Sequence, residues 1–274
     1  NKGFDMSLHG VIIQKEDFEW SASLNFSTYK NKVLDLGNKT FIETTRLGAP
    51  ANDVASQLMV GQPVGTFWGA VYEGIDPENG DAIFADLSGP EGVPDGEFDP
   101  VYDKTVIGSA NPDFYGGFQT NFIFKNFDLN AFFPFSVGND VYNTEAFLAG
   151  EVQINSFASL RENMWSVENP ENASFPKVGS TSFNRSSSYF VQDGSFFRLG
   201  TLQFGYSLPT GLVKGIANCR FYFTGTNLFL VKSDDYLGYD PDVSSYGDDP
   251  VQRGFDNMSY PQNRSFIVGL DITF

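Results

Sequence analysis

The sequence predicts an all-β protein: a transmembrane antiparallel β-barrel, represented by the C-terminal portion (about nine strands) of a larger barrel with long extracellular loops. Three observations predict this class. Segments alternate apolar and polar residues, they run for ~9–11 residues, and their connections are short at one end and long at the other. The last ten residues, "SFIVGLDITF", show the alternation, with an apolar row at every second position: Phe266, Val268, Leu270, Ile272 and Phe274. Because a strand places successive side chains on opposite faces, this segment has one apolar face.

The expected strands follow the same pattern in order along the chain. "NKGFDMSLHG" is already in strand rhythm, and "FEWSASLNFS" alternates five apolar with five polar residues. "FYGGFQTNFIF", "FDLNAFFPFSV", "TLQFGYSL" and "NCRFYFTGTNL" each place aromatic residues in one register. The expected strands cover residues 4–14, 17–30, 39–46, 65–75, 114–125, 127–138, 196–208, 217–230 and 263–274. The 39–46 strand has the weakest pattern and is included so that upward and downward crossings alternate. Since a single-chain barrel requires an even number of strands, the odd count predicts that earlier strands precede this sequence.

The connections between these strands predict the sidedness of the barrel. Short turns are expected at "QKED", at Asn126 and at "PTGLVKGIA", and long gaps at about 76–113, 139–194 and 231–262. The long gaps carry most of the acidic residues. A weak helical spacing of Phe157, Leu160 and Met164 predicts a short helix within the second gap. Short turns on one side and long loops on the other are typical of outer-membrane barrels.

The alternation also assigns the two faces of the expected wall. The apolar rows should face lipid, and the polar rows should line the lumen or face a plug inside it. The expected lumen-facing residues are Glu19, Asn25, Gln119, Asn121, Asp128 and Asn130. A soluble β-sandwich also has alternating strands, but its strands are shorter and its turns are short at both ends.

Composition excludes several classes of function. A formal net charge of −17 argues against a nucleic-acid partner. One histidine, His9, and one cysteine, Cys219, are too few for a zinc site, a disulfide or a Ser-His-Asp triad. Paired carboxylates for glycoside hydrolysis are the only conceivable catalytic chemistry, and no local motif selects a pair. The sequence therefore predicts that the protein is not an enzyme.

Several phrases resemble the C-terminal part of the SusC-like TonB-dependent outer-membrane transporters, in the order in which that family carries them. They are "DFEWSASLNFSTYKNKVLDLG", "VGQPVGTFWGAVYEGIDPENGDAIFAD", "DKTVIGSANPDFYGGFQTNFIFKNFDLNAFFPFSVGNDVYN", "FVQDGSFFRLGTLQFGYSLP" and "YPQNRSFIVGLDITF". The resemblance spans essentially the whole chain, residues 1–274. It implies a bacterial outer-membrane barrel of about 22 strands, with an N-terminal plug and a segment that contacts the TonB complex, both absent from this sequence.

The resemblance also implies a function and partners. The family imports oligosaccharides, and in some members peptides, beneath a SusD-like surface lipoprotein lid. The C-terminal Phe274 matches the residue that the outer-membrane assembly machinery recognises. Residues 236–243, "YLGYDPDV", are expected at the outer rim. The expected contacts to the substrate or the lid are Trp165, Tyr236, Tyr239, Asp240 and Asp242.

One departure from the family concerns calcium. Many relatives carry an Asp-x-Asn-Gly-Asp-Gly run where this chain has "DLSGPEGVPDGEFD". Asp86 is retained, but Ser88, Pro90 and Glu91 interrupt the oxygen-ligand spacing. No cofactor is therefore expected, and calcium in the acidic loops is a secondary possibility. A soluble carbohydrate-binding β-sandwich and a peptide importer of the same barrel family remain alternatives to oligosaccharide import.

Overall fold

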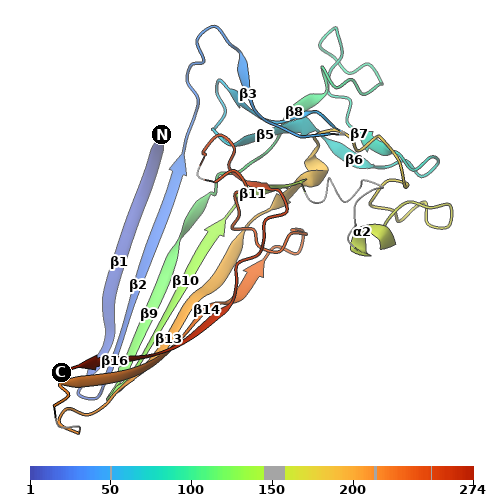
Figure 1. Ribbon diagram of the computed structural model, residues 1–274. Helices are drawn as coiled ribbons and strands as arrows, with labels where there is room; N and C mark the ends of the chain where they lie inside the picture. The colour runs from blue at the N-terminus through green and yellow to red at the C-terminus, as the bar shows by residue number, and fades with distance from the viewer. Residues whose placement is uncertain (50, 145–157, 213–214, 248) are drawn as a thin grey trace.

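A seven-stranded antiparallel sheet dominates the computed structural model, which describes residues 1–49, 51–144, 158–212, 215–247 and 249–274. Across the sheet, the strands are β1 (Lys2–Lys15), β2 (Phe18–Lys30), β9 (Phe114–Phe124), β10 (Phe127–Val137), β13 (Phe196–Ser207), β14 (Asn218–Lys232) and β16 (Ser265–Thr273). Their order in the sheet follows their order in the chain, so the sheet is an up-and-down meander (Figure 1). In the described residues β1 pairs with β2 alone and β16 with β14 alone, so the sheet is open. This all-β wall confirms the predicted fold class.

The connections confirm the predicted sidedness. At one end of the sheet, short turns join β1 to β2 and β9 to β10, and residues 208–217 join β13 to β14. At the other end, long segments cover residues 31–113, 138–195 and 233–264. The described parts of these segments gather at the upper end of the sheet in Figure 1, opposite the short turns.

Two of the expected crossings need correction. Residues 39–46 contain β3 (Phe41–Arg46), and residues 65–75 contain β5 (Thr66–Ala70) and β6 (Tyr72–Ile75). None of these strands joins the main sheet, which therefore has seven strands in place of the expected nine. β5 is mostly buried along its length, so its apolar residues serve a protein core and not a lipid-facing row. With five residues it is also shorter than the ~9–11 residues of a crossing strand.

The long segments fold together into a layer above the sheet. Its four-stranded sheet has the order β3, β4 (Val54–Met59), β5 and β8 (Lys104–Ser109), and β6 pairs with β7 (Ala82–Phe84). A third sheet joins β12 (Val191–Asp193), β11 (Asp140–Asn143) and β15 (Phe255–Asp256). A 3-10 turn, η1 (Ser188–Phe190), and a short helix, α2 (Ala158–Glu162), complete the layer. The helix confirms that this gap contains a short helix. Of the three spaced residues only Leu160 lies in it, because Met164 follows the helix and bridges to Phe175, and Phe157 lies outside the described residues.

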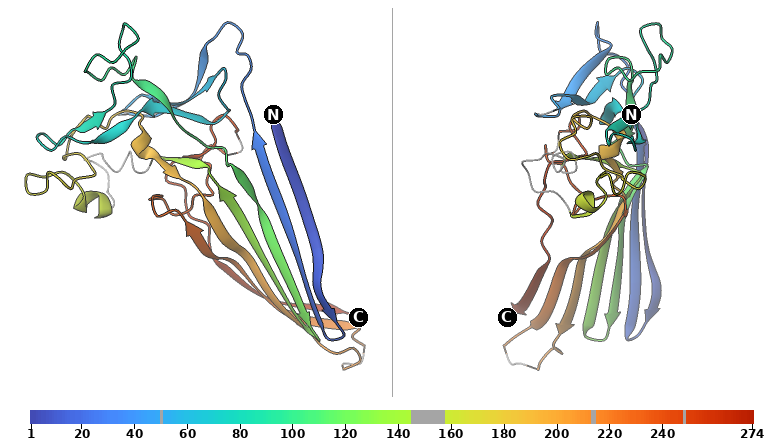
Figure 2. Two further views of the ribbon diagram at one scale, coloured as in Figure 1. Left: turned by 180° about the vertical axis from the view of Figure 1, so that it is seen from behind. Right: turned by 90° about the vertical axis from the view of Figure 1, so that its right-hand side faces the viewer.

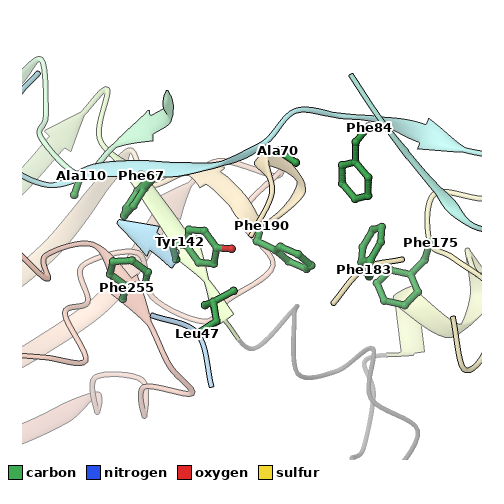
Figure 3. Close-up of a cluster of buried hydrophobic side chains, with 11 residues drawn as sticks. Leu47, Phe67, Ala70, Phe84, Ala110, Tyr142, Phe175, Phe183, Phe190 and Phe255 are labelled. Carbon is green, nitrogen blue, oxygen red and sulfur yellow. The ribbon is translucent and has the colours of Figure 1, made fainter. Parts of the chain in front are cut away.

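An aromatic core holds this loop layer together. The ring of Phe67 lies 5.7 Å from that of Tyr142 and 5.2 Å from that of Phe255, measured between centroids. These rings come from three different long segments, as Figure 3 shows, and all are fully buried. Phe190 and Phe183 continue the core toward β7. The loop layer is therefore a packed structure with its own hydrophobic interior.

The wall itself is thin. Figure 2 shows the main sheet from the side, with the loop layer at one end and no second described sheet covering its strands. A β-sandwich needs such a second sheet to bury its apolar face. Among the described residues, no helix has the length and hydropathy required to span a membrane.

Candidate functional site

One face of the main sheet is apolar and carries two groups of aromatic side chains. Strand register aligns the first group in a single row near the short turns: Phe18, Phe124, Phe127, Tyr206 and Phe221. The second group lies near the loop layer: Phe114, Phe133, Phe135, Phe197 and Phe229. Between them, Trp20, Phe122, Phe204 and Phe223 continue the aromatic character, and the central row aligns smaller residues such as Ala22 and Ala131.

The spacing of the two aromatic groups matches a bilayer. Phe135 follows Phe127 by eight positions in β10, about 27 Å along a strand at ~3.4 Å per residue. If the strand is tilted by ~40° from the membrane normal, the separation measured along that normal is about 20 Å. This is close to the ~25 Å apolar band between the aromatic girdles of membrane barrels. Phe204 and Phe223, on strands inside the sheet, are 45% and 41% exposed. Exposed aromatic residues on inner strands indicate that this face contacts lipid.

The opposite face is polar. The residues expected to line the lumen all share it, because pairing aligns Ser21, Asn121, Asn130, Gln203 and Thr224 in one row. Neighbouring register positions of the same face hold the other expected residues: Glu19, Asn25, Gln119 and Asp128. Ile123 and Phe132 are apolar exceptions on this face.

Side-chain hydrogen bonds cross-link the polar face. The amide of Asn130 donates to the side-chain oxygen of Asn121, and the amide of Gln203 donates to the Thr224 hydroxyl at 3.0 Å. The strongest contact is bidentate: the Arg220 guanidinium donates to both carboxylate oxygens of Asp128 at 3.0 Å and 2.6 Å.

Gly205 makes room for this ion pair. A Cβ at Gly205 would lie 2.5 Å from the Arg220 guanidinium. Arg220 is not among the expected lumen-facing residues, although its alternation with Cys219 and Phe221 places it on the polar side of β14.

The loop layer packs against the polar face. Arg253, in the third long segment, donates to the Tyr29 hydroxyl at 3.2 Å, and Tyr29 donates to Asn111 at 2.9 Å. Lys232, at the end of β14, donates to the carbonyl of Gly238 at 2.9 Å. The loops therefore fold over the end of the polar face, as expected for the inner side of a barrel mouth.

The expected rim segment, residues 236–243, divides into buried and exposed residues. Tyr236 is 1% exposed, and its hydroxyl donates to the carboxylate of Asp256. Asp240 is also buried and pairs with Arg198 at 2.5 Å. These two residues anchor the segment, because their side-chain polar atoms are bound by Asp256 and Arg198, which lie outside it. Tyr239, at 64% exposure, and the half-exposed side chain of Asp242 face solvent.

Trp165 lies in a different part of the loop layer. Its indole N–H donates to the carbonyl of Pro77 at 3.1 Å, and its ring covers Gly80. Gly80 has φ +75°, and a Cβ there would lie 2.5 Å from the indole ring. Lys177 binds the same turn through the carbonyl of Asn79 at 2.8 Å. Trp165 is thus a packing partner of this turn, separate from the rim segment.

The acidic loop that departs from the family's calcium pattern is organised by a carboxylate. Asp103 is fully buried and accepts hydrogen bonds from the backbone N–H groups of Asp99, Leu87 and Ser88 at 2.6–2.8 Å. The backbone N–H of Asp99, followed by those of Ser88 and Leu87, lowers the pKa of Asp103 against the opposing effect of burial. In the described residues no group of His, Cys, Asp or Glu is arranged to hold a metal ion.

A cavity of about 260 Å³ lies where the rim segment meets the polar face. Its walls come from the strand ends, from β11 and from the third long segment, and include Tyr115, Ser136, Asp140, Asp242 and Arg253. Burial raises the pKa of Asp140, and the nearby Asp193 and Asp113 raise it further against a hydrogen bond from the Ser109 N–H.

Phe274 directly follows β16 and continues the alternation of its apolar row. It is 87% exposed and follows Thr273, which pairs with Asn218 at the short-turn end of β14. Its position places an aromatic ring at the level where membrane barrels carry an aromatic girdle.

Comparisons with known proteins agree with this geometry. No family model matches the chain. It is 35% identical over 301 residues to TonB-dependent receptor P3 of Formosa agariphila, covering 100% of this chain and 28% of that protein. It is 27% identical over 286 residues to TonB-dependent receptor SusC of Bacteroides thetaiotaomicron, covering 100% of this chain and 26% of SusC. The solved RagAB peptide transporter superposes with a TM-score of 0.79 at 25% identity, over 99% of this chain and 29% of that chain.

The chain thus spans less than a third of the length of the relatives it matches. An open meander with a lipid-facing apolar side and a polar inner side defines part of an outer-membrane β-barrel wall. Taken with these similarities, the chain belongs to the SusC-like TonB-dependent receptors.

Proposed function

We propose that this chain forms part of an outer-membrane transporter that imports a bulky polar nutrient, most favourably an oligosaccharide, by a TonB-dependent route. The observation that carries the proposal is the polar face, which extends from the cavity at the rim toward the short turns. Its central row consists of neutral hydrogen-bonding groups: Ser21, Asn121, Asn130, Gln203 and Thr224. Such groups suit a hydroxyl-rich neutral solute, because they supply donors and acceptors without demanding a counter-charge.

Transport in this scheme makes and breaks no covalent bond, so the protein acts as a carrier and not as an enzyme. The partners belong to the same proposal. A SusD-like lipoprotein covers the loop layer, the TonB complex acts through a segment outside this chain, and Phe274 serves barrel assembly. Tyr239 and Asp242 are the rim residues available for substrate or lid contact, because both are exposed. Trp165, half-buried against the 77–80 turn, is a candidate on the outer part of the layer.

Peptide import is the second candidate, since the solved RagAB structure is described as a peptide transporter. Uptake by cells carrying the full-length gene separates the two. Fluorescent neutral oligosaccharides and fluorescent peptides are supplied with and without a protonophore, and cells lacking the gene are the control. Energy-dependent accumulation of the oligosaccharides alone supports the proposal. Accumulation of peptides alone favours the second candidate, and uptake unaffected by gene loss or protonophore contradicts both.

A further inference from the structure

The cavity at the rim is built from parts of the chain that are far apart in sequence. Tyr115 and Ser136 come from the ends of β9 and β10, Asp140 from β11, and Asp242 and Arg253 from the third long segment. A volume of about 260 Å³ is slightly below the ~300 Å³ at which pockets for drug-sized ligands begin. The cavity is thus sized for one unit of a polymer.

The charged groups of the cavity keep hydrogen-bonding capacity that the fold does not use. Oδ2 of Asp140 accepts the Ser109 N–H at 2.8 Å, while Oδ1 accepts no hydrogen bond in the part of the chain that the structure describes. The carboxylate of Asp242 lies 3.8 Å from Arg198, which is bound closely by Asp240. Among the described residues Arg253 forms no ion pair, and its one side-chain bond is to the Tyr29 hydroxyl.

We propose that this cavity is a binding subsite for one sugar unit of a neutral oligosaccharide, held by Asp140, Asp242 and Arg253 against the ring of Tyr115. The inference rests on the proposed import function and names the substrate class and the residues of its rim site. Tyr115 is 41% exposed and offers an aromatic surface beside the polar groups. Sugar hydroxyls donate to the two carboxylates and accept from the guanidinium, so one neutral ligand satisfies all three groups.

Charge distinguishes this ligand from a peptide end. The cavity contains a guanidinium and carboxylates within one small volume. The terminal ammonium of a peptide is attracted by the carboxylates and repelled by Arg253. The terminal carboxylate of a peptide is attracted by Arg253 and repelled by the carboxylates. A neutral polyol meets no like-charge repulsion. Below the cavity, the central row of the polar face also presents uncharged hydroxyl and amide groups, which can hydrogen-bond to a neutral polyol.

The test measures binding to the purified full-length transporter in detergent. The probes are short neutral fragments of glucan, xylan, mannan and galactan, with a random peptide mixture as the competing class. Variants Asp242→Asn and Arg253→Met remove charge from the cavity, and Asp235→Asn removes an exposed carboxylate of the same segment outside it. Heat-modifiable migration on gels verifies that each variant is folded. We expect the best-bound fragment to lose about tenfold or more in affinity in both cavity variants and nothing in Asp235→Asn.

Three outcomes would overturn the inference. If the wild-type protein imports oligosaccharides but both cavity variants bind them normally, the subsite is wrong and the proposed function stands. If peptides bind and the cavity variants weaken that binding, the saccharide class is wrong. If no fragment binds the wild-type protein and no oligosaccharide enters cells, the subsite and the oligosaccharide function fall together.

Discussion

The guanidinium of Arg198 in β13 lies 2.5 Å from the carboxylate of Asp240 in the rim segment, and the two side chains are only 5% and 6% exposed. This pair ties the third long segment to the polar face of the wall. Removing one partner of a buried pair leaves an uncompensated charge and typically costs ~3–5 kcal/mol.

The first prediction concerns this pair. In the full-length protein, Arg198→Met should lower hydrogen-exchange protection in residues 236–243 by about two to four powers of ten, the equivalent of that free energy. Asp235→Asn, at an exposed position of the third long segment just before residues 236–243, should leave protection unchanged. Wild-type protection in Arg198→Met would show that the pair does not hold the rim.

The second prediction concerns the two faces of the wall. Leu24 pairs with Leu8 and Phe118 on the apolar face, and Ser23 pairs with His9 and Gln119 on the polar face. Leu24→Arg should cost ~2–4 kcal/mol because it places a charge in the lipid band, and Ser23→Arg should cost much less. Folding yields in lipid vesicles, scored by gel migration, measure the difference. Equal yields for these adjacent substitutions would contradict the assignment of the faces.

The third prediction concerns the aromatic core of the loop layer. Phe67→Ala should cost ~3–5 kcal/mol, because the ring is fully buried between Tyr142 and Phe255. Since those partners come from different long segments, proteolysis of folded protein should increase in all of them together. Tyr239→Ala, at an exposed position, is the matched control. Increased cleavage in residues 31–113 alone would show that the segments fold independently.

The fourth prediction concerns pH. Backbone N–H donors lower the pKa of Asp103 from its ordinary value of 3.8. The ionised carboxylate therefore stabilises the 86–103 loop fully at pH values above 3.8. This stabilisation should be lost as the pH falls through the lowered pKa. Hydrogen exchange at Leu87 and Ser88, corrected for intrinsic rates, should then lose protection in acid. In Asp103→Asn, protection should be weak already at neutral pH, whereas Glu91→Gln should behave as wild type.

The strands and faces of the wall could be predicted because every crossing strand has lipid on one side and the lumen on the other. Each strand therefore shows the same two-residue alternation of apolar and polar side chains. The prediction of 114–125 and 127–138 lies within one residue of β9 and β10, and the polar residues selected from these strands share one face. The apolar residues at every second position face lipid and not a distant part of the chain. Each strand can therefore be recognised from its own sequence.

The loop layer could not be predicted in the same way. Residues 65–75 have strand character, but β5 is buried by Tyr142 and Phe255, which lie far along the chain. The same limit applies at the rim. Aromatic and acidic residues in a loop suggested solvent contacts for Tyr236 and Asp240, whereas distant partners, Asp256 and Arg198, bury them. The alternation of apolar and polar residues shows on which face of a strand a side chain lies, but it does not show which distant residue that side chain contacts.

The assignment of this sheet as a barrel wall requires that its apolar side faces lipid and that its polar side faces the barrel interior. Spin labels at single cysteines through residues 127–136 of β10, in full-length protein with Cys219→Ser and in lipid vesicles, test it most directly. We expect labels at 127, 129, 131, 133 and 135 to be relaxed by oxygen dissolved in the lipid. Labels at the intervening positions should not be relaxed by that oxygen. The same oxygen accessibility at both sets of positions, or the reversed pattern, would contradict the account.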